Sequence, residues 1–469
     1  MKNSDSFLKQ IKAFVGENCL TVEPSELSAY SHDEFATDEY NTLPLAVVKP
    51  TREEQVSEVL KACSEWSIPV TARGGGTGLS AGCVPSKRGI VLSLEKLNKK
   101  IEVDEENLCI TVEAGVTLKQ LYDVAEEAGL FFPPHPGDES ATVGGMIATN
   151  AGGARAVKYG TIKQFVRGLK VALADGEIIS LGGKILKSST GYHLLDLMIG
   201  SEGTLGVVTE ITLSLLPPPG TIETLVVPFA TVEEAIDSVS VLFKIGVIPF
   251  AVEFIEHPVL AFVERLLNKS WPTKEGAASL LIMLDGPGKE EVLATAEKIG
   301  EALEGYGALD VLLAEHKERQ EEILSLRSMI YEALRPGTGE LFDICVPRSE
   351  ISGHVRFIHR LEKESGVPLP TYGHAADGNV HTHSMKVGLV ESGMGEPIPD
   401  WFEKHRKIRE SIYDDIVKRG GVISGEHGIG LVKRDFLLKN IGGRNVELMK
   451  ALKKAFDPKG ILNPGILFL

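Results

Sequence analysis

The sequence predicts a protein of mixed α/β (α+β) class with more than one domain. Capping-box patterns stand at 51–54, 117–120 and 231–234, each ahead of an apolar stripe with helical spacing. Short apolar runs bounded by turn residues, such as Ile68–Ala72, are typical of strands. The run Pro217-Pro218-Pro219-Gly220 is a stiff break. Helices and strands are therefore expected on both sides of a boundary.

The first part of the chain is expected to combine helices with short strands. The spacing of Phe7, Leu8, Ile11, Phe14 and Val15 predicts an amphipathic helix at the N-terminus. Capping boxes led by Thr51 and Thr117 predict two further helices. The strand at Ile68–Ala72 runs into Gly74-Gly75-Gly76, and residues 168–181 are typical of a hairpin that turns at Asp175-Gly176.

The second part is expected to form its own sheet. Its pattern alternates strands and helices in a βαβ-rich order, typical of an α/β or α+β domain. From about residue 402 the chain is predicted to be mostly helical, apart from a glycine-rich segment at 420–430. We expect domains at 1–219, 220–420 and 421–469. The expected strands of the second part are 222–229, 248–255, 279–285 and 309–314, and its helices lie at about 232–245, 257–269 and 289–304.

Composition excludes several classes of protein. The 469 residues include 65 acidic and 49 basic side chains, and the net charge of −16 argues against non-specific binding to nucleic acid or anionic lipid. No apolar run approaches the length of a membrane span, and the N-terminus lacks the apolar core of a signal peptide, so we expect a cytoplasmic protein. The five cysteines include no CxxC pair, which disfavours both a disulfide framework and an iron–sulfur cluster.

The first glycine-rich segment, Ala72–Gly82, contains five glycines in eleven residues. Such a loop lets backbone N–H groups approach an anion closely. It includes a look-alike of the Rossmann fingerprint, Gly76-x-Gly78-x-x-Ala81, but the following strand at 90–94 is too near for a crossover helix, so we reject that interpretation. Phosphate binding on a loop is expected instead.

Two more glycine-rich segments follow. One runs from Pro134 to Gly153 and includes Ser140 and Thr142, whose hydroxyls can donate hydrogen bonds; the other is Gly200–Gly206. Small residues over so many positions let a flat ligand lie against the backbone. Three such segments in one domain indicate an extended dinucleotide rather than a single phosphate.

Histidines gather at Thr371–His383, where three of the twelve fall within thirteen residues around an Asp-Gly-Asn turn. That turn can bring His374 and His381 together, and the two-residue period of a strand places His383 on the same face as His381. A distant segment supplies Glu426 and His427. Histidine and carboxylate can hold a divalent metal and move a proton near neutral pH, so we predict an enzyme if these segments meet.

Taken together, these motifs resemble the FAD-linked oxidases of the vanillyl-alcohol-oxidase/p-cresol methylhydroxylase type. Within them the chain is similar to the branch that holds D-lactate dehydrogenase and the D-type polypeptide of glycolate oxidase. The resemblance covers roughly residues 40–469 and rests on ARGGGTGLSAG, HPGDESATVGGMIATNAGG, GSEGTLG, GHAADGNVH and SGEHGIG, which occur in the family's order. It implies an FAD-binding domain of the p-cresol methylhydroxylase (PCMH) type with two α/β subdomains, an antiparallel-sheet substrate (cap) domain at 220–420, and a helical C-terminal segment that returns to the FAD domain.

The resemblance also implies which residues bind FAD. Residues 73–79 would hold the pyrophosphate, and Asn463 would mark the return of the chain to the FAD domain. Relatives with covalently bound flavin have a histidine where this chain has Gly76-Thr77, so non-covalent FAD is expected. The implied FAD-binding residues are Arg73, Gly74, Gly75, Gly76, Thr77, Gly78, Leu79, Pro136, Gly137, Ser140, Thr142, Gly144, Gly145, Ala148, Gly152, Tyr159, Glu202, Gly203, Val208 and Asn463.

In the family, oxidation of a 2-hydroxy acid uses a metal and a histidine base. The resemblance implies that His374, His381 and Glu426 hold a divalent cation (Zn, Mn or Fe), and that His427 is the base near the flavin. Arg327, as first choice, and Arg348 would bind the substrate carboxylate, and His383 would contact substrate or metal. These roles at the catalytic centre are expectations that rest on matched positions.

The implied reaction is FAD-dependent oxidation of D-lactate, or of glycolate, to the 2-oxo acid. Alternatives are a D-2-hydroxyglutarate-type dehydrogenase, a non-catalytic FAD electron-transfer subunit, and a flavin-dependent transferase of ether-lipid synthesis. Relatives that oxidise 2-hydroxyglutarate have a lysine where this chain has Leu341, which favours a small acid. The expected acceptor is external: an electron-transferring flavoprotein, iron–sulfur subunits or a quinone, in a homo- or hetero-oligomer.

Overall fold

The computed structural model describes residues 2–35, 39–390 and 393–468. The chain divides into two compact units. Unit 1 comprises residues 1–152, 161–218 and 426–469, and unit 2 comprises residues 153–160 and 219–425. The sequence predicted changes of domain after residues 219 and 420, whereas the units change over after Pro218 and Gly425, and the short excursion at 153–160 was not anticipated.

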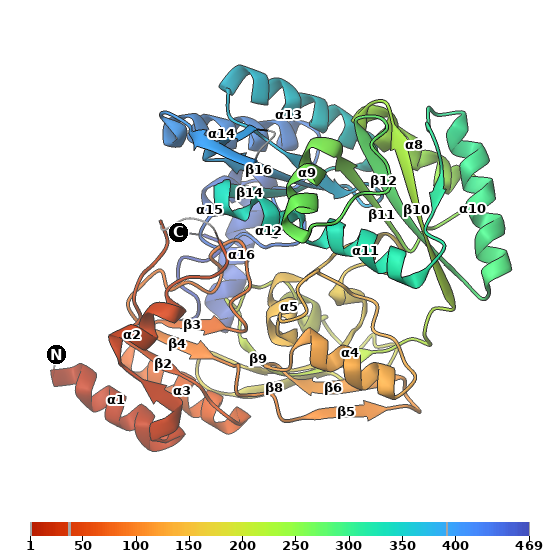
Figure 1. Cartoon of the computed structure of the whole chain (residues 1–469). Coiled ribbons are helices and arrows are strands. Elements are labelled where there is room, and N and C mark those ends of the chain that lie inside the picture. Colours follow the sequence, from red (N-terminus) through yellow and green to blue (C-terminus); the bar gives the residue numbers. More distant parts are fainter. Residues whose placement is uncertain (1, 36–38, 391–392, 469) are drawn as a thin grey trace. The chain divides into compact units, whose positions relative to one another are not determined.

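Unit 1 contains a small sheet with strand order β1-β2-β4-β3 (Figure 1). Strands β2, β4 and β3 run parallel. The predicted N-terminal helix is confirmed as α1, whose Phe7, Ile11 and Val15 are buried and whose Phe7 packs against Trp66 of α3, with ring centroids 6.0 Å apart. The elements are α1 (Lys2–Val15), β1 (Leu20–Thr21), α2 (Pro24–Leu27), β2 (Ala46–Val48), α3 (Glu53–Trp66), β3 (Val70–Arg73) and β4 (Ile90–Ser93).

The connection from β3 to β4, residues 74–89, is described throughout and contains no helix. The rejection of a Rossmann helix in this segment is therefore confirmed. The glycine loop leaves the end of β3 as irregular backbone, in which Gly76 has a φ of 79°. That left-handed conformation favours glycine.

A second sheet of unit 1 has the order β5-β6-β9-β7-β8 and antiparallel pairing. The hairpin predicted at 168–181 is confirmed as β7 and β8, which pair from Gly168–Gly182 to Ala172–Ile178. The strands are β5 (Ile101–Asp104), β6 (Cys109–Glu113), β7 (Val166–Ala172), β8 (Ile178–Gly182) and β9 (Val207–Ser214); the helices of this unit also include α4 (Leu118–Glu127), α5 (Val143–Thr149), α7 (Leu194–Met198), α15 (Arg434–Ile441) and α16 (Gly443–Phe456).

Two of the three predicted capping boxes are confirmed. Thr117 and Thr231 each accept a hydrogen bond from the backbone three residues on, and the side chains of Gln120 and Glu234 return it. The box predicted at Thr51 is wrong, because α3 begins only at Glu53. The amide of Thr51 instead donates to Gln55 Oε1 at 2.9 Å, one residue beyond the expected partner.

Unit 2 is built on a sheet with the order β13-β10-β12-β11-β15-β16-β14, paired antiparallel as the resemblance implied. Its first half has the order of a split βαβ arrangement, because β12 lies between β10 and β11. The βαβ-like sequence pattern thus yields an antiparallel sheet. The strands are β10 (Thr221–Phe229), β11 (Ala251–Glu256), β12 (Ala278–Gly286), β13 (Leu312–Leu313), β14 (Thr338–Cys345), β15 (Thr371–His374) and β16 (Asn379–Met385), with β17 (Val387–Val390) and β18 (Gly393–Pro397) as a separate pair.

Helices cover both faces of the unit 2 sheet. Helices α8 and α10 pack along β10 and β12 (Figure 1). On the other face, an apolar cluster joins α9, α11 and α12 to Ile255, Leu281, Tyr372 and Met385. Directly opposed residues of neighbouring strands share a face, so Glu253, His374, His381 and Asp343 lie on that second face as well. The helices are α6 (Ala156–Tyr159), α8 (Val232–Lys244), α9 (His257–Leu267), α10 (Lys289–Glu304), α11 (Lys317–Ser328), α12 (Ile330–Leu334), α13 (Ile351–Ser365) and α14 (Trp401–Lys418).

The helical character predicted after residue 402 is confirmed in α14, α15 and α16, and the intervening 421–433 stretch contains no helix. Among the residues that the structure describes, no helix is both long and apolar enough to cross a bilayer.

Candidate active site

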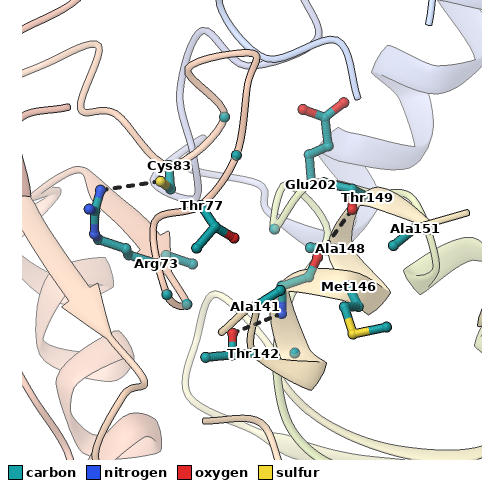
Figure 2. A pocket seen from close by; sticks show the side chains of 18 of the residues that line it. Arg73, Thr77, Cys83, Ala141, Thr142, Met146, Ala148, Thr149, Ala151 and Glu202 are labelled. Carbon is teal, nitrogen blue, oxygen red and sulfur yellow. Dashed lines mark hydrogen bonds between the residues drawn. The ribbon is translucent and has the colours of Figure 1, made fainter. Parts of the chain in front are cut away.

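Unit 1 encloses a cavity of about 250 Å³ (Figure 2). All three glycine-rich segments line it, although they lie far apart in the sequence. The first follows β3, the second enters α5, and the third precedes β9. Glu426, His427 and Asn463 complete the lining from the C-terminal part of the chain. The cavity therefore brings together the segments expected to bind a dinucleotide.

Most of the residues implied for FAD line this cavity, and three do not. Gly137 and Ser140 lie on an exposed turn, where the Ser140 hydroxyl donates to Asp138 Oδ1 at 2.7 Å. Tyr159 belongs to unit 2, where its ring packs edge-on against Phe250 at 5.9 Å. The structure thus places Asp138 and Ala141 where Gly137 and Ser140 were expected.

The side chain of Arg73 points away from the glycine loop. It donates to the carbonyl oxygen of His32 at 2.6 Å and lies 3.3 Å from the Cys83 sulfur, which Figure 2 shows. Its guanidinium also lies over the Tyr30 ring at 5.4 Å. Arg73 therefore ties the 30–33 segment to β3, and an anion on this loop would meet backbone N–H groups rather than its guanidinium.

Glu202 organises the turn that follows His427. Its carboxylate accepts hydrogen bonds from the amides of Ile429 and Gly430, both at 2.8 Å. The Ser80 hydroxyl donates to the carbonyl of Gly428 at 3.0 Å. Burial raises the pKa of Glu202, and the two amides oppose that shift only in part. These contacts fix the backbone that presents Glu426 and His427 to the cavity.

The C-terminal return of the chain is confirmed in unit 1. Asn463 accepts from the amide of Ala72 at 2.8 Å and donates to the carbonyl of Glu202 at 2.7 Å. Leu462 pairs with Val70 as an isolated parallel bridge. Asn463 therefore joins the first and third glycine segments at one point of the cavity wall.

The lining of the cavity fits an extended, flat cofactor such as FAD. A Cβ atom at Gly78 or Gly82 would meet only a carboxylate oxygen at 3.5 Å, and one at Gly145 would approach the Thr142 hydroxyl at 3.2 Å. Side chains at these positions would fill the space that the glycines leave. Backbone amides and small side chains can then contact the cofactor closely.

In unit 2, the predicted turn at 377–379 does bring two histidines together. Strands β15 and β16 form a hairpin in which His374 pairs with Asn379 and Tyr372 with His381. The imidazole rings of His374 and His381 lie edge-to-face, with centroids 5.3 Å apart. Both side chains are buried.

Glu253 of β11 joins His374 to Arg327. Its carboxylate accepts from His374 Nδ1 at 2.6 Å and from Arg327 Nε at 2.9 Å. Burial raises the pKa of Glu253, but Arg327 and His374 outweigh burial and hold that pKa below its ordinary value. Because Nδ1 of His374 donates to this carboxylate, Nε2 carries the lone pair that a metal would use, an arrangement typical of metal-binding histidines.

Asp343 of β14 faces His381 across the strand pair. Its Oδ1 lies 4.0 Å from His381 Nδ1 and accepts from the Asn379 side chain at 2.8 Å. Its Oδ2 accepts from the Ser424 hydroxyl at 3.0 Å and the Gly425 amide at 3.1 Å. Asp343 therefore fixes the chain immediately before Glu426.

The other predicted catalytic residues of unit 2 have different surroundings. His383 is fully buried, and its Nδ1 and Nε2 lie 2.8 Å from the Thr338 hydroxyl and 3.1 Å from the Tyr372 hydroxyl. Arg348 lies on an exposed turn ahead of α13, where its guanidinium stacks over Phe243 at 4.4 Å. His383 is thus held by core hydroxyls, and Arg348 is held by an aromatic ring.

Sequence reasoning missed Glu253, Asp343 and Tyr372. A signal was present for the two acids, because each interrupts an otherwise apolar strand, AVEFIE and ELFDIC. A charged group inside a buried strand requires a partner. Tyr372 carried no such signal, since tyrosine is common in strands.

The comparisons identify the family. Residues 218–467 match the family described as FAD linked oxidases, C-terminal domain, and residues 44–182 match the FAD binding domain. The chain belongs to the FAD-linked oxidases. It is 47% identical over 419 residues to a D-lactate dehydrogenase of Archaeoglobus fulgidus, covering 89% of this chain and 90% of the relative. It is 38% identical over 443 residues to the glycolate oxidase subunit GlcD of Bacillus subtilis, covering 94% and 92%.

Solved structures agree with the fold. The structure of p-cresol methylhydroxylase superposes with a TM-score of 0.80 at 20% identity and covers 99% of this chain and 97% of that one. The predicted class and the resemblance are confirmed. The chain is an FAD-linked oxidoreductase of the D-lactate dehydrogenase/glycolate oxidase type.

Proposed function

We propose that this protein oxidises a small D-2-hydroxy acid, with D-lactate preferred and glycolate second, to the corresponding 2-oxo acid. The observation that carries the proposal is the His374–His381 pair with its carboxylate partners on one face of the unit 2 sheet. The relatives named D-lactate dehydrogenase and glycolate oxidase subunit support the same chemistry. FAD-linked dehydrogenation and a metal-assisted proton transfer together account for both observations.

FAD would be held without a covalent bond by the residues that line the unit 1 cavity, with loop 74–79 toward its pyrophosphate. When bound, FAD supplies the acceptor for the hydride equivalent of the alcohol. Gly203, Val208 and Asn463 would contact it from the third glycine segment and the C-terminal return. Glu202 would act indirectly, because its carboxylate already holds the amides of residues 429–430.

His374, His381 and Glu426 would hold the divalent cation, which acidifies a hydroxyl bound to it. The donor set of two imidazoles and one carboxylate suits Zn, Mn or Fe and leaves positions for substrate. Chain connectivity supports the role of Glu426, because it directly follows Gly425, whose amide donates to Asp343 beside His381.

His427 would accept the hydroxyl proton of the substrate, since a neutral imidazole is the usual base near neutral pH. Arg327 would bind the substrate carboxylate with the guanidinium edge that does not contact Glu253. Arg348 becomes the second choice for this role, because its guanidinium stacks on Phe243.

Leu341 supports a substrate with one carboxylate. It lies in β14, is buried, and pairs with His383 across the sheet. An apolar side chain at this position offers no charge for a second carboxylate, which disfavours a 2-hydroxyglutarate-type reaction. The electrons would pass to a separate acceptor, such as an electron-transferring flavoprotein or iron–sulfur subunits, as the word subunit in the name of the Bacillus subtilis relative suggests.

The test is anaerobic mixing of the FAD-loaded protein with D- and L-hydroxy acids while the flavin absorbance is followed. D-lactate should bleach the flavin, and His427→Ala should abolish bleaching while FAD stays bound. His193→Ala is the matched control, because His193 is an exposed histidine of the same unit. Bleaching at the full rate in His427→Ala would remove this residue as the base.

Metal dependence is tested separately. Treatment with EDTA should remove the activity, and Zn²⁺, Mn²⁺ or Fe²⁺ should restore it. A metal-independent flavin transferase or an electron-relay subunit would not respond in this way.

A further inference from the structure

His383 is surrounded by donors and acceptors that fix where its proton lies. The Thr338 hydroxyl next to Nδ1 also lies 2.8 Å from the carbonyl oxygen of Leu334. A carbonyl oxygen can only accept, and a hydroxyl has one proton to give. Thr338 therefore donates to Leu334 and accepts from His383, so Nδ1 of His383 carries a hydrogen.

The proton on Nδ1 determines the direction of the next hydrogen bond. In the neutral tautomer, Nε2 is an acceptor, so the Tyr372 hydroxyl donates to it across 3.1 Å. Tyr372 and His383 are both buried, so this bond is shielded from water. The bonds from Tyr372 through His383 and Thr338 to Leu334 thus all run in one direction and fix the orientation of the Tyr372 ring.

Tyr372 contacts the groups assigned to substrate and metal. The Arg327 guanidinium lies over its ring, 4.9 Å from the centroid. The ring of His381 lies 5.4 Å away on the opposed strand. A cation over an aromatic face is attracted by the ring, and more strongly where water is excluded. The position of the Tyr372 ring therefore affects where Arg327 lies.

We propose that His383 is a positioning residue, which anchors Tyr372 as the platform on which Arg327 meets the carboxylate of the substrate. This inference rests on the proposed function and replaces the expectation that His383 contacts substrate or metal. It also explains why an ionisable residue lies in the core without a role at the reacting atoms. Thr338 is the outer member of the same chain of hydrogen bonds.

The test compares His383→Asn, Tyr372→Phe and the double variant. Each single variant removes one hydrogen bond and should raise KM for D-lactate about fivefold, with kcat changed less than about twofold. Because both residues act through the same bond, the double variant should resemble the single variants rather than multiply their effects. An unchanged KM, or a multiplicative double variant, would overturn the proposal.

His354→Asn is the matched control. His354 is also a fully buried histidine of unit 2, but its Nδ1 bonds to Asp415 on α14, outside this chain of hydrogen bonds. It should leave KM unchanged even if it lowers the thermal midpoint. The same rise of KM in His354→Asn would indicate a general effect of core damage and would refute a specific role of His383.

A measurement without substrate separates this inference from the proposed function. Nitrogen-15 NMR of the FAD-loaded protein with labelled histidine should assign to His383 a protonated Nδ1 and an unprotonated Nε2, and Tyr372→Phe should shift the Nε2 resonance. The opposite tautomer would refute the positioning role at any level of activity. If the wild-type protein oxidises no hydroxy acid, the proposed function fails, while the NMR result still decides the hydrogen-bond direction.

Discussion

Glu253 is the one carboxylate that contacts both His374 and Arg327, so Glu253→Gln tests two assigned roles with a change of one charge. The glutamine keeps the shape but offers a neutral oxygen to the His374 N–H. Loss of such a carboxylate partner typically lowers metal affinity by about 10- to 100-fold, or about 1.4 to 2.7 kcal/mol. The magnitude should lie toward the upper end, because Glu253 is only 3% exposed and water cannot replace it.

The assay is metal retention, measured by elemental analysis after equilibration with graded concentrations of a chelator. Glu256→Gln is the matched control, because Glu256 ends the same strand and also accepts from a histidine, His359, at 3.0 Å. Glu253→Gln should lose metal at about 10- to 100-fold lower chelator concentration than the wild type, and Glu256→Gln should not. A folded Glu253→Gln protein with wild-type retention would refute the assignment of His374 as a ligand.

Glu253→Gln should also move Arg327. The guanidinium side chain is 15% exposed and would lose its charged partner. Removing one member of a buried ion pair costs about 3 to 5 kcal/mol, and the amide oxygen of glutamine should recover part of that. A fall in thermal stability together with a higher KM for the hydroxy acid is therefore expected, and retention of both would contradict the contact with Arg327.

Two further predictions concern unit 1. Burial raises the pKa of Asp33 from 3.8 to about 6, so its contribution to stability is fully present below pH 3.8 and is lost as the pH rises through 6. Asp33→Asn should therefore gain about 2 kcal/mol relative to the wild type between pH 4.5 and 7 in denaturant titrations, and a constant difference would contradict the shifted pKa. Gly430→Ala should lower flavin content, because φ is 55° and a Cβ would clash with the Ser80 carbonyl oxygen; Gly460→Ala, with φ of 66° and no neighbour within 4 Å, should not, and equal losses would implicate the backbone angle alone.

The local elements could be predicted because their causes are local. The apolar spacing of Phe7, Ile11 and Val15 places one face of α1 in the core. The helix predicted at 289–304 matches α10, and the Asp175-Gly176 turn joins β7 to β8. The capping box at Thr51 failed because a shift of one residue changes which side chain reaches the amide.

The partners of the candidate site could not be predicted, because they depend on contacts across the sheet. Glu253 and His374 are 121 residues apart in the chain and meet only through the pairing of β11 with β15. The sequence likewise assigned Arg73 to an anion, whereas its guanidinium binds the carbonyl of His32. No property of either residue alone indicates its partner.

By itself, the sequence determined the class of fold, the three glycine-rich segments and the residue types that suit FAD and a metal. Glycines that leave room for a cofactor and histidines spaced around a turn follow from short-range rules of backbone geometry. The tertiary structure decided which polar groups are already engaged, because burial removes water and forces each group to find a protein partner. That requirement turned His383 from an expected contact of the substrate into a residue held between the hydroxyls of Thr338 and Tyr372.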